Sequence, residues 1–284
     1  MIPAYNREDC LTITLEQIAK TAEQNIFYYL FVLDTGFRST VLGICNRWLK
    51  SHKGEVLRID PSQARSPIKQ SYALYKGYHR ALEITSNYVF MIEDDIAISN
   101  RFFEWHYKIL EKLPDVQLSI GTRQRDIPYP LVKDFDSYII RSDYQSLGVC
   151  WRKDALYGAL QLFKPEYWHD PFGYIERVYP QVRQHFVASQ DGLIHKHIIA
   201  NGLRVAFPVY PRAFHFGVAG ANRPVKRITG TLEQKIAKVK QIAFNEAALK
   251  AELAKYNAPL DPYFYDSIPI DLVQVTVNIG DEQV

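Results

Sequence analysis

The sequence has 284 residues, 47% of them hydrophobic and 23% charged, so it is long enough to bury one large core. A formal charge of only +3 argues against a nucleic-acid partner or a polybasic membrane surface. No apolar run approaches the length of a membrane span, no signal peptide opens the sequence, and the three cysteines have neither zinc nor disulfide spacing. We therefore expect no integral membrane segment and a reducing compartment, the cytoplasm.

Apolar runs and amphipathic stretches alternate through the first 120 residues. Residues 2–7 look like the end of a first strand and its turn, so either that strand is very short or upstream residues are missing. Helices are then expected at 10–23 (capped by Asp9), 39–50, 69–84 and 100–113, and strands at 26–33, 56–59, 88–92 and 116–120. Continuous apolar strands separated by such helices predict an α/β fold with a mostly parallel sheet flanked by helices.

The second half of the chain is less regular. Residues 122–143 and the proline-bearing segment 164–180 predict loop and irregular structure, with helices at 153–163 and 191–200 and a strand at 203–209. Thr231 and Gln234 have capping-box spacing at the start of a helix that runs to about residue 255, and residues 268–279 alternate like an edge strand. We predict one main domain over 1–228, with halves 1–120 and 121–228, and a C-terminal extension over 229–284.

Three adjacent carboxylates, Glu93, Asp94 and Asp95, follow the apolar strand at 88–92. In a parallel α/β sheet, ligands bind where strands end at their carboxyl edge. If the strand continues, residues 93 and 95 point to one side and offer two oxygen ligands to a hard cation such as Mg²⁺ or Mn²⁺. The alternative is a solvated acidic turn before the next helix.

Four sequence blocks, in matching order and spacing, resemble the GT-A glycosyltransferases, which use nucleotide-sugar donors. The opening IPAYNRED is similar to their donor-binding start, and VLDTGF to their second strand with its acidic residue. FMIEDDIAISNRFFEW resembles the metal-binding segment of the family 13 N-acetylglucosaminyltransferases, and DGLIHKHIIANGLRVAFPVYPRAFHFGVAG resembles their acceptor-side segment. The blocks cover residues 1 to 224 and imply a GT-A catalytic domain; the opening is equally similar to the family 2 transferases.

The resemblance implies which side chains contact a UDP-sugar. Asp34 would accept a hydrogen bond from the uracil or ribose, and Asn222 would close over the donor phosphates. The predicted nucleotide-sugar-binding set also includes Lys76, a lysine of the helix expected at 69–84 that would offset diphosphate charge. The full set is Pro3, Tyr5, Arg7, Asp34, Lys76, Glu93, Asp94 and Asn222.

Asp95 and Asp191 carry the chemistry that the resemblance implies. Asp95 would bind the metal ion, Mn²⁺ or Mg²⁺, and Asp191 would be the general base. The chain departs from the family at two positions. Gln190 precedes a single Asp191 where the family has two carboxylates, and Gly77 stands where the family has a histidine. The acceptor-side tryptophans of the family are also absent, so the acceptor and the transferred sugar stay open.

Four residues have alternative interpretations from their own chemistry. Asp191 suits an inverting transfer, which needs one base, but a carboxylate at a helix N-terminus is also favoured by the helix dipole. His215 could ligate Mn²⁺ or be structural. Lys76 could offset diphosphate charge or be an exposed lysine. Trp168 could be an acceptor platform, although core packing is the default.

Taken together, these features predict an inverting, metal-dependent glycosyltransferase that moves a sugar from a UDP-sugar to a glycan or other hydroxyl acceptor. UDP-N-acetylglucosamine is the donor that the resemblance suggests. The alternatives are a catalytically inactive module that binds nucleotide-sugars or glycans, and a structural protein with a fortuitous acidic turn. A nucleotidyltransferase is disfavoured because no glycine-rich phosphate loop follows the first strand.

Overall fold

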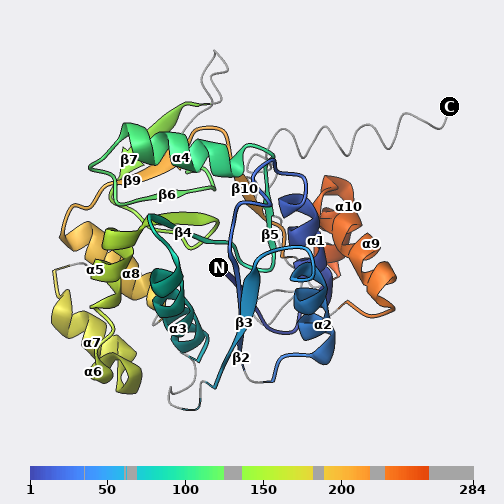
Figure 1. Ribbon diagram of the computed structural model, residues 1–284, viewed down its shortest axis with the longest axis horizontal. Helices are drawn as coiled ribbons and strands as arrows, with labels where there is room; N and C mark the ends of the chain where they lie inside the picture. The colour runs from blue at the N-terminus through green and yellow to red at the C-terminus, as the bar shows by residue number, and fades with distance from the viewer. Residues whose placement is uncertain are drawn as a thin grey trace.

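Strands and helices alternate through the first 91 residues, as predicted (Figure 1). The computed structural model describes residues 1–34, 36–60, 62, 69–124, 136–181, 189–217 and 228–255. The first elements are β1 (Ile2–Ala4), α1 (Glu8–Ile18), β2 (Tyr29–Asp34), α2 (Ser39–Trp48), β3 (Gly54–Ile59), α3 (Lys69–Ile84) and β4 (Tyr88–Met91). Because α1 begins at Glu8, Asp9 lies in its first turn and does not cap it, contrary to the prediction.

The strands of the described residues form three sheets, and the two larger ones meet at β1. One sheet is parallel, in the order β1-β2-β3, and the other is mixed, in the order β4-β8-β6-β9-β7. The Met1 amino group donates to the Phe90 carbonyl at 2.7 Å, and the Ile92 N–H donates to the Met1 carbonyl at 3.1 Å, so β1 also lies parallel to β4. The carboxyl ends of β1, β2 and β4 therefore open at one edge, where ligands bind in such sheets.

The α/β class is confirmed, and the sheet is more mixed than the apolar strands predict. β8 (Val149–Arg152) pairs antiparallel with both β4 and β6 (Leu118–Ile120), β6 pairs parallel with β9 (Val205–Pro208), and β7 (Tyr138–Arg141) is antiparallel to β9. The loop predicted over 122–143 is thus wrong at 138–141. β7 and β8 each have four residues, too few to show a period, and their pairing comes from distant partners.

The segment that follows the acidic residues forms a separate two-stranded antiparallel sheet. β5 (Ile96–Ile98) pairs antiparallel with β10 (Ala213–His215), with His215 opposite Ile96. The sequence did not predict either strand as a separate element, because each has only three residues. This pairing brings residue 215 beside the end of β4, across more than a hundred residues of chain.

Helices cover the sheets on both sides. Figure 1 shows α1 and α2 on one side of the parallel strands and α3 on the other. Beyond α3 lie α5 (Lys153–Leu160), α6 (Pro165–His169), α7 (Pro171–Val178) and α8 (Gln190–Ala200), whereas α4 (Phe102–Lys112) lies at the top of the view, near β6. The irregular structure predicted for 164–180 is wrong, because the two prolines open helices as their first residues and Asp170 caps α7 by accepting from the Gly173 N–H.

The C-terminal helices pack against α1. α9 (Leu232–Ala243) opens with the predicted capping box, in which Thr231 accepts from the Gln234 N–H at 3.3 Å. The single long helix predicted there is interrupted after Ala243, and α10 (Glu246–Ala254) follows. Lys235 on α9 donates to Glu8 on α1 at 2.8 Å. The predicted strand at 268–279 lies outside the described residues, and none of the described helices is long and apolar enough to cross a bilayer.

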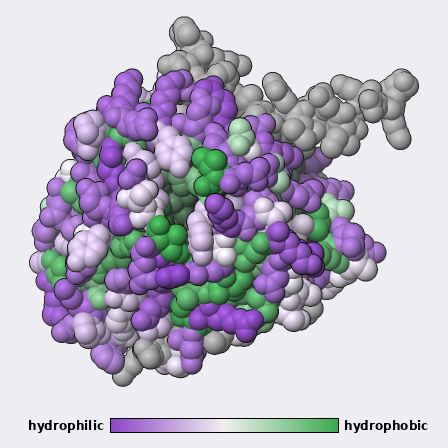
Figure 2. Space-filling view, viewed as in Figure 1, coloured by the Kyte–Doolittle hydropathy of each residue, from purple (hydrophilic) through white to green (hydrophobic). Residues whose placement is uncertain are grey.

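Apolar packing is continuous from the sheets to both helical layers. The largest buried side chains include Trp105, Tyr167, Phe31 and Phe207, each almost fully buried. On the face shown in Figure 2, hydrophilic side chains cover most of the surface, and hydrophobic ones gather around the region of the edge strand β3.

Candidate active site

The acidic trio lies in the turn between β4 and β5. The strand ends at Met91, and the Ile96 N–H donates to the Glu93 carbonyl at 3.1 Å, which closes the turn. The strand does not continue, so the predicted projection of residues 93 and 95 to one side does not apply. Instead Asp94 and Asp95 are both buried, at 3% and 1% exposure, and Glu93 is partly buried.

Arg7 holds the two buried aspartates together. Its guanidinium pairs with Asp94 Oδ1 through one nitrogen and with Asp95 Oδ2 through the other. Burial raises the pKa of Asp94 to about 7, although the Arg7 charge opposes the shift. Burial also acts to raise the pKa of Asp95, but His215 and Arg7 outweigh it and hold that pKa below its usual value. The two carboxylates that share Arg7 therefore differ in pKa: Asp95 ionises below the usual range, whereas Asp94 ionises near pH 7.

His215 contacts the same carboxylate from the opposite strand. Its Nε2 lies 2.8 Å from Asp95 Oδ2, and the N–H of Phe216 donates to the Asp95 carbonyl at 3.0 Å. Gly217 completes this turn, because a Cβ at that position would lie 2.0 Å from Asp95 Oδ2. Sequence reasoning did not single out Gly217, and the only available signal was its place in the His-Phe-Gly turn.

Asp191 lies at the N-terminus of α8, beside the same acidic group. Ser146 Oγ donates to its Oδ2 at 3.2 Å, and Gln190 Nε2 donates to its Oδ1 at 2.9 Å. Burial raises the pKa of Asp191 to about 6, and these two hydrogen bonds limit the rise. The pKa of Glu93 lies well above its usual value, first because of burial and then because Asp95, Asp191 and Asp94 repel its charge. Four carboxylates from two distant segments thus interact in one site.

The nucleoside candidates gather at the ends of β1 and β2. Pro3 pairs with Val32 in the parallel ladder, and Asp34 ends β2. The Tyr5 ring is 44% exposed and lies over Gly36, whose φ of 91° requires a residue without a side chain. Together with Arg7, these residues form one border of the site, which is the grouping that the sequence predicted.

Lys76 is not brought to this group. Lys76 is exposed on α3 with its ammonium 5.5 Å from the centre of the Tyr72 ring, so its role toward phosphate stays a prediction. Asn222 lies outside the described residues. Trp168 packs among aromatic rings, 5.2 Å from Tyr72 between ring centres, which agrees with core packing.

Gly77 has a steric reason to replace the histidine of the resembling family. A Cβ at Gly77 would lie 2.6 Å from Val32 Cγ2 and 2.8 Å from Met1 Sδ. Helix α3 therefore packs directly on β1 and β2 at this position. A histidine would fit only if the helix moved away from the sheet.

The predicted divalent cation would have to bind beside Asp95. Its Oδ1 is buried and has no hydrogen-bond partner among the described residues. No three aspartate, glutamate, histidine or cysteine side chains of the described chain converge as a complete ligand set. This suits Mg²⁺ or Mn²⁺, which commonly take one or two protein ligands and complete their shell with substrate phosphates and water.

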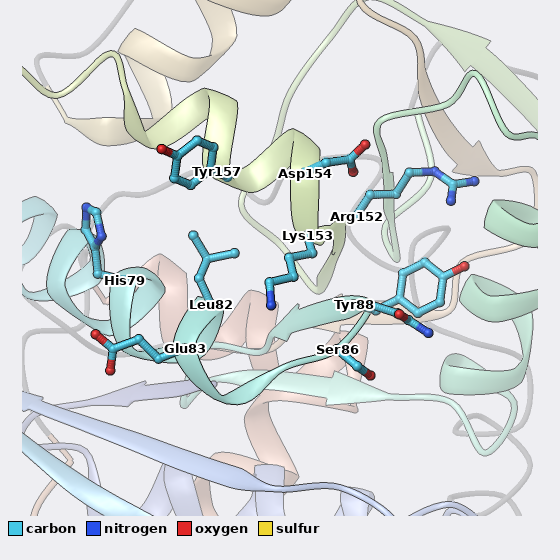
Figure 3. Close-up of a pocket in the computed structure, with 10 residues that line it drawn as sticks. His79, Leu82, Glu83, Ser86, Tyr88, Arg152, Lys153, Asp154 and Tyr157 are labelled. Atoms are coloured by element: carbon cyan, nitrogen blue, oxygen red, sulfur yellow. The ribbon is translucent and has the colours of Figure 1, made fainter.

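A separate pocket of about 780 Å³ lies at the other end of β4, where that strand begins at Tyr88 (Figure 3). None of the predicted site residues lines it. Its cations have structural partners: Lys153 Nζ donates to the Thr85 carbonyl at 2.7 Å, and Arg152 donates to the carbonyls of Leu113, at the end of α4, and Val116, at 3.1 and 2.8 Å. The acidic group at the far end of the strand remains the better candidate for chemistry.

Comparison with known proteins gives similarity in structure alone. No protein-family model matches the sequence, and no curated protein matches it. Among solved structures, S. aureus TarS 1–349 has 13% identity and a TM-score of 0.49, over 99% of this chain and 71% of that one. The complex of S. aureus TarS 1–349 with UDP-GlcNAc has 13% identity and a TM-score of 0.46, over 92% of this chain and 66% of that one.

A third similar structure is the galactosyltransferase LgtC in complex with donor and acceptor sugar analogs. It has 12% identity and a TM-score of 0.42, over 73% of each chain. All three TM-scores lie below 0.5. The proposal that follows therefore rests on the geometry of the site.

Proposed function

We propose that the chain is an inverting glycosyltransferase that moves a sugar from a UDP-sugar to the hydroxyl of a glycan or other acceptor, with the help of a divalent cation. The observation that carries the proposal is the meeting of two different carboxylate environments at one sheet edge. Arg7 bridges Asp94 and Asp95, whereas Asp191 has no cationic partner among the described residues, and burial raises its pKa to about 6. Carboxylates with separated pKa values are typical of sites where one binds and another moves a proton.

On the donor side, the residues at the ends of β1 and β2 would hold the nucleoside. The exposed face of Tyr5 offers a stacking surface, and the Asp34 carboxylate offers an acceptor for a uracil or ribose donor group. Asp95 and His215 would hold Mn²⁺ or Mg²⁺, which when bound would offset the charge of the leaving diphosphate. Arg7 supplies a fixed positive charge at the same place.

On the acceptor side, Asp191 would act as the general base. The acceptor oxygen attacks the anomeric carbon, the bond from that carbon to the diphosphate oxygen breaks, and the acceptor proton passes to Asp191. The products are the glycoside and UDP. A base with a pKa of about 6 is ionised at neutral pH and still binds a proton more strongly than an ordinary aspartate. Glu93, whose pKa is raised well above its usual value, would be protonated and could donate a hydrogen bond to a sugar oxygen.

A second candidate, an inactive module that binds nucleotide-sugars or glycans, is favoured by one observation. Arg7 already pairs with both Asp94 and Asp95, and His215 contacts Asp95, so the acidic pair has partners without any added ion. A module of this kind would bind UDP without turnover and would not need Asp191. The two candidates therefore differ in what Asp191 does.

Calorimetric titration of UDP tests the proposal, first with Mn²⁺ and then with EDTA. The transferase predicts binding that weakens at least tenfold with the chelator, followed by UDP release from a UDP-sugar when acceptor hydroxyls are supplied. Chelator-insensitive binding without UDP release supports the binding module. No binding in either condition rejects both.

A further inference from the structure

Asp191 is held by a neighbouring amide whose own orientation is locked. Ser71 Oγ, on α3, donates to Gln190 Oε1 at 2.7 Å and accepts from the Gln190 backbone N–H at 3.1 Å. Gln190 Nε2 then donates to Asp191 Oδ1 at 2.9 Å. Ser71 and Gln190 are 1% and 5% exposed, so solvent does not compete for these bonds.

The chemistry of the partners allows only this orientation of the amide. An ionised carboxylate accepts hydrogen bonds and cannot donate them, so the NH₂ group of Gln190 must face Asp191. The carbonyl oxygen then faces Ser71, whose hydroxyl has one proton to donate to it and a lone pair left for the Gln190 N–H. A flipped amide would place two oxygens against each other at Asp191.

We propose that Gln190 is a positioning residue for the base: its locked amide occupies Asp191 Oδ1 and leaves Oδ2 as the atom that takes the acceptor proton. Among the described residues, Oδ2 accepts only the longer hydrogen bond from Ser146, at 3.2 Å. This inference rests on the proposed function, because it assigns the proton-accepting atom of that reaction. It also explains why a neutral Gln190 stands beside the base, where a second carboxylate would compete for the same proton.

Other titratable groups face Asp191 from every element packed around it. Glu93 comes from the end of β4, Tyr78 from α3, Tyr144 from the segment before β8 and Tyr167 from α6. The tyrosines all have a pKa raised above their usual value by burial, so they do not ionise near neutral pH.

His195, one turn further along α8, is a further titratable group among the described residues. It lies 3.1 Å from Asp143 Oδ1, so it is already engaged by a carboxylate other than Asp191. All of these groups are unchanged by a substitution at residue 190. A shift in pH dependence on substituting Gln190 therefore reports its own contact with Asp191.

The test is a pair of substitutions that keep the size of the side chain. Gln190→Glu places a second carboxylate at hydrogen-bond distance from Asp191, so the two would share a proton and the pKa of the base would rise. We expect the acid limb of the kcat–pH profile to move up by about one pH unit or more, with roughly fivefold less transfer near pH 6 for a shift of one unit. Gln190→Met removes the donor without adding charge and should move the limb upward by less.

Two controls separate this effect from general charge and folding effects. Gln161→Glu adds the same charge at the exposed end of α5 and should leave the profile unchanged. Ser71→Ala frees the Gln190 amide and should give a smaller shift than Gln190→Glu. Circular dichroism and thermal melting establish that each variant is folded.

A readout without turnover separates this inference from the proposed function. The carboxyl carbon of Asp191, identified by its loss in Asp191→Asn, is titrated by ¹³C NMR in wild type and Gln190→Glu. If the wild type is active, and the acid limb of the kcat–pH profile and the carboxyl titration of Asp191 are both unchanged in folded Gln190→Glu, the positioning role alone is overturned. If the carboxyl titration of Asp191 shifts in Gln190→Glu but the wild type transfers no sugar, the coupling is supported and the proposed function is overturned.

Discussion

Replacing Asp191 with asparagine should remove transfer and stabilise the protein at the same time. Burial raises the pKa of Asp191 from 3.8 to about 6, so the folded protein holds this proton more tightly than the unfolded chain. Stability from this group is complete below about pH 3.8 and is lost as the pH rises through 6. The loss reaches about 3 kcal/mol near pH 8 and is only about 1 kcal/mol near pH 4.5.

Asparagine should fit the same contacts without ionising. Its Oδ1 can accept from Gln190, and its Nδ2 can donate to the Ser146 hydroxyl, which turns to accept. We therefore expect the free energy of unfolding to exceed that of wild type by up to about 3 kcal/mol near pH 8 and by about 1 kcal/mol near pH 4.5. Urea unfolding monitored by tryptophan fluorescence at the two pH values measures this difference.

The same variant should bind UDP with wild-type affinity while transfer falls by about a hundredfold or more, since a positioned base contributes that much. A variant equally stable or less stable than wild type at both pH values would refute the burial argument. Transfer at the normal rate would refute the assignment of the base.

Four further substitutions test the surroundings of Asp95 and the ion pairs between α9 and α1. Gly217→Ala would place a methyl group against Asp95 Oδ2 and should cost about 1–3 kcal/mol of stability in thermal melts, together with UDP affinity; an unchanged melting temperature would contradict the close approach. Asp95→Ala should remove the chelator-sensitive part of UDP binding in calorimetry, and a response to EDTA that persists would place the ion elsewhere. Lys235→Met breaks the buried ion pair with Glu8 and should lower the free energy of unfolding by about 1–3 kcal/mol. Lys240→Met removes the exposed ion pair with Glu16 and should cost less than about 1 kcal/mol. Equal losses in the two variants would contradict the argument that burial makes the first pair more important.

Much of the acidic site could be predicted from the sequence because its residues stand at the ends of recognisable elements. Glu93, Asp94 and Asp95 follow an apolar strand, and Asp191 opens a periodic helix. Parallel strands bring their carboxyl ends to one edge, so such residues are expected to meet. His215 was weighed as a possible ligand, and its contact with Asp95 is consistent with that role.

The contacts that complete the site were not predictable in the same way. Gly217 matters through the space it leaves for Asp95, and Ser71 matters through a hydrogen bond to a residue more than a hundred positions away. Neither has a local pattern, since a small or polar residue carries no periodic signal. The antiparallel insertion of β8 was missed for a similar reason, because four residues show no period.

The sequence by itself determined the α/β class, most of the elements of the first half and the positions of the carboxylates, because these depend on local periodicity and on where apolar runs end. Only the tertiary structure decided which charges are shared. Arg7 bridges Asp94 and Asp95, and Gln190 engages Asp191, because long-range pairing of strands and helices places these groups within hydrogen-bond reach in a buried setting. The same burial sets the pKa of each carboxylate, since loss of water and proximity of charge depend on the folded surroundings and not on neighbours in sequence.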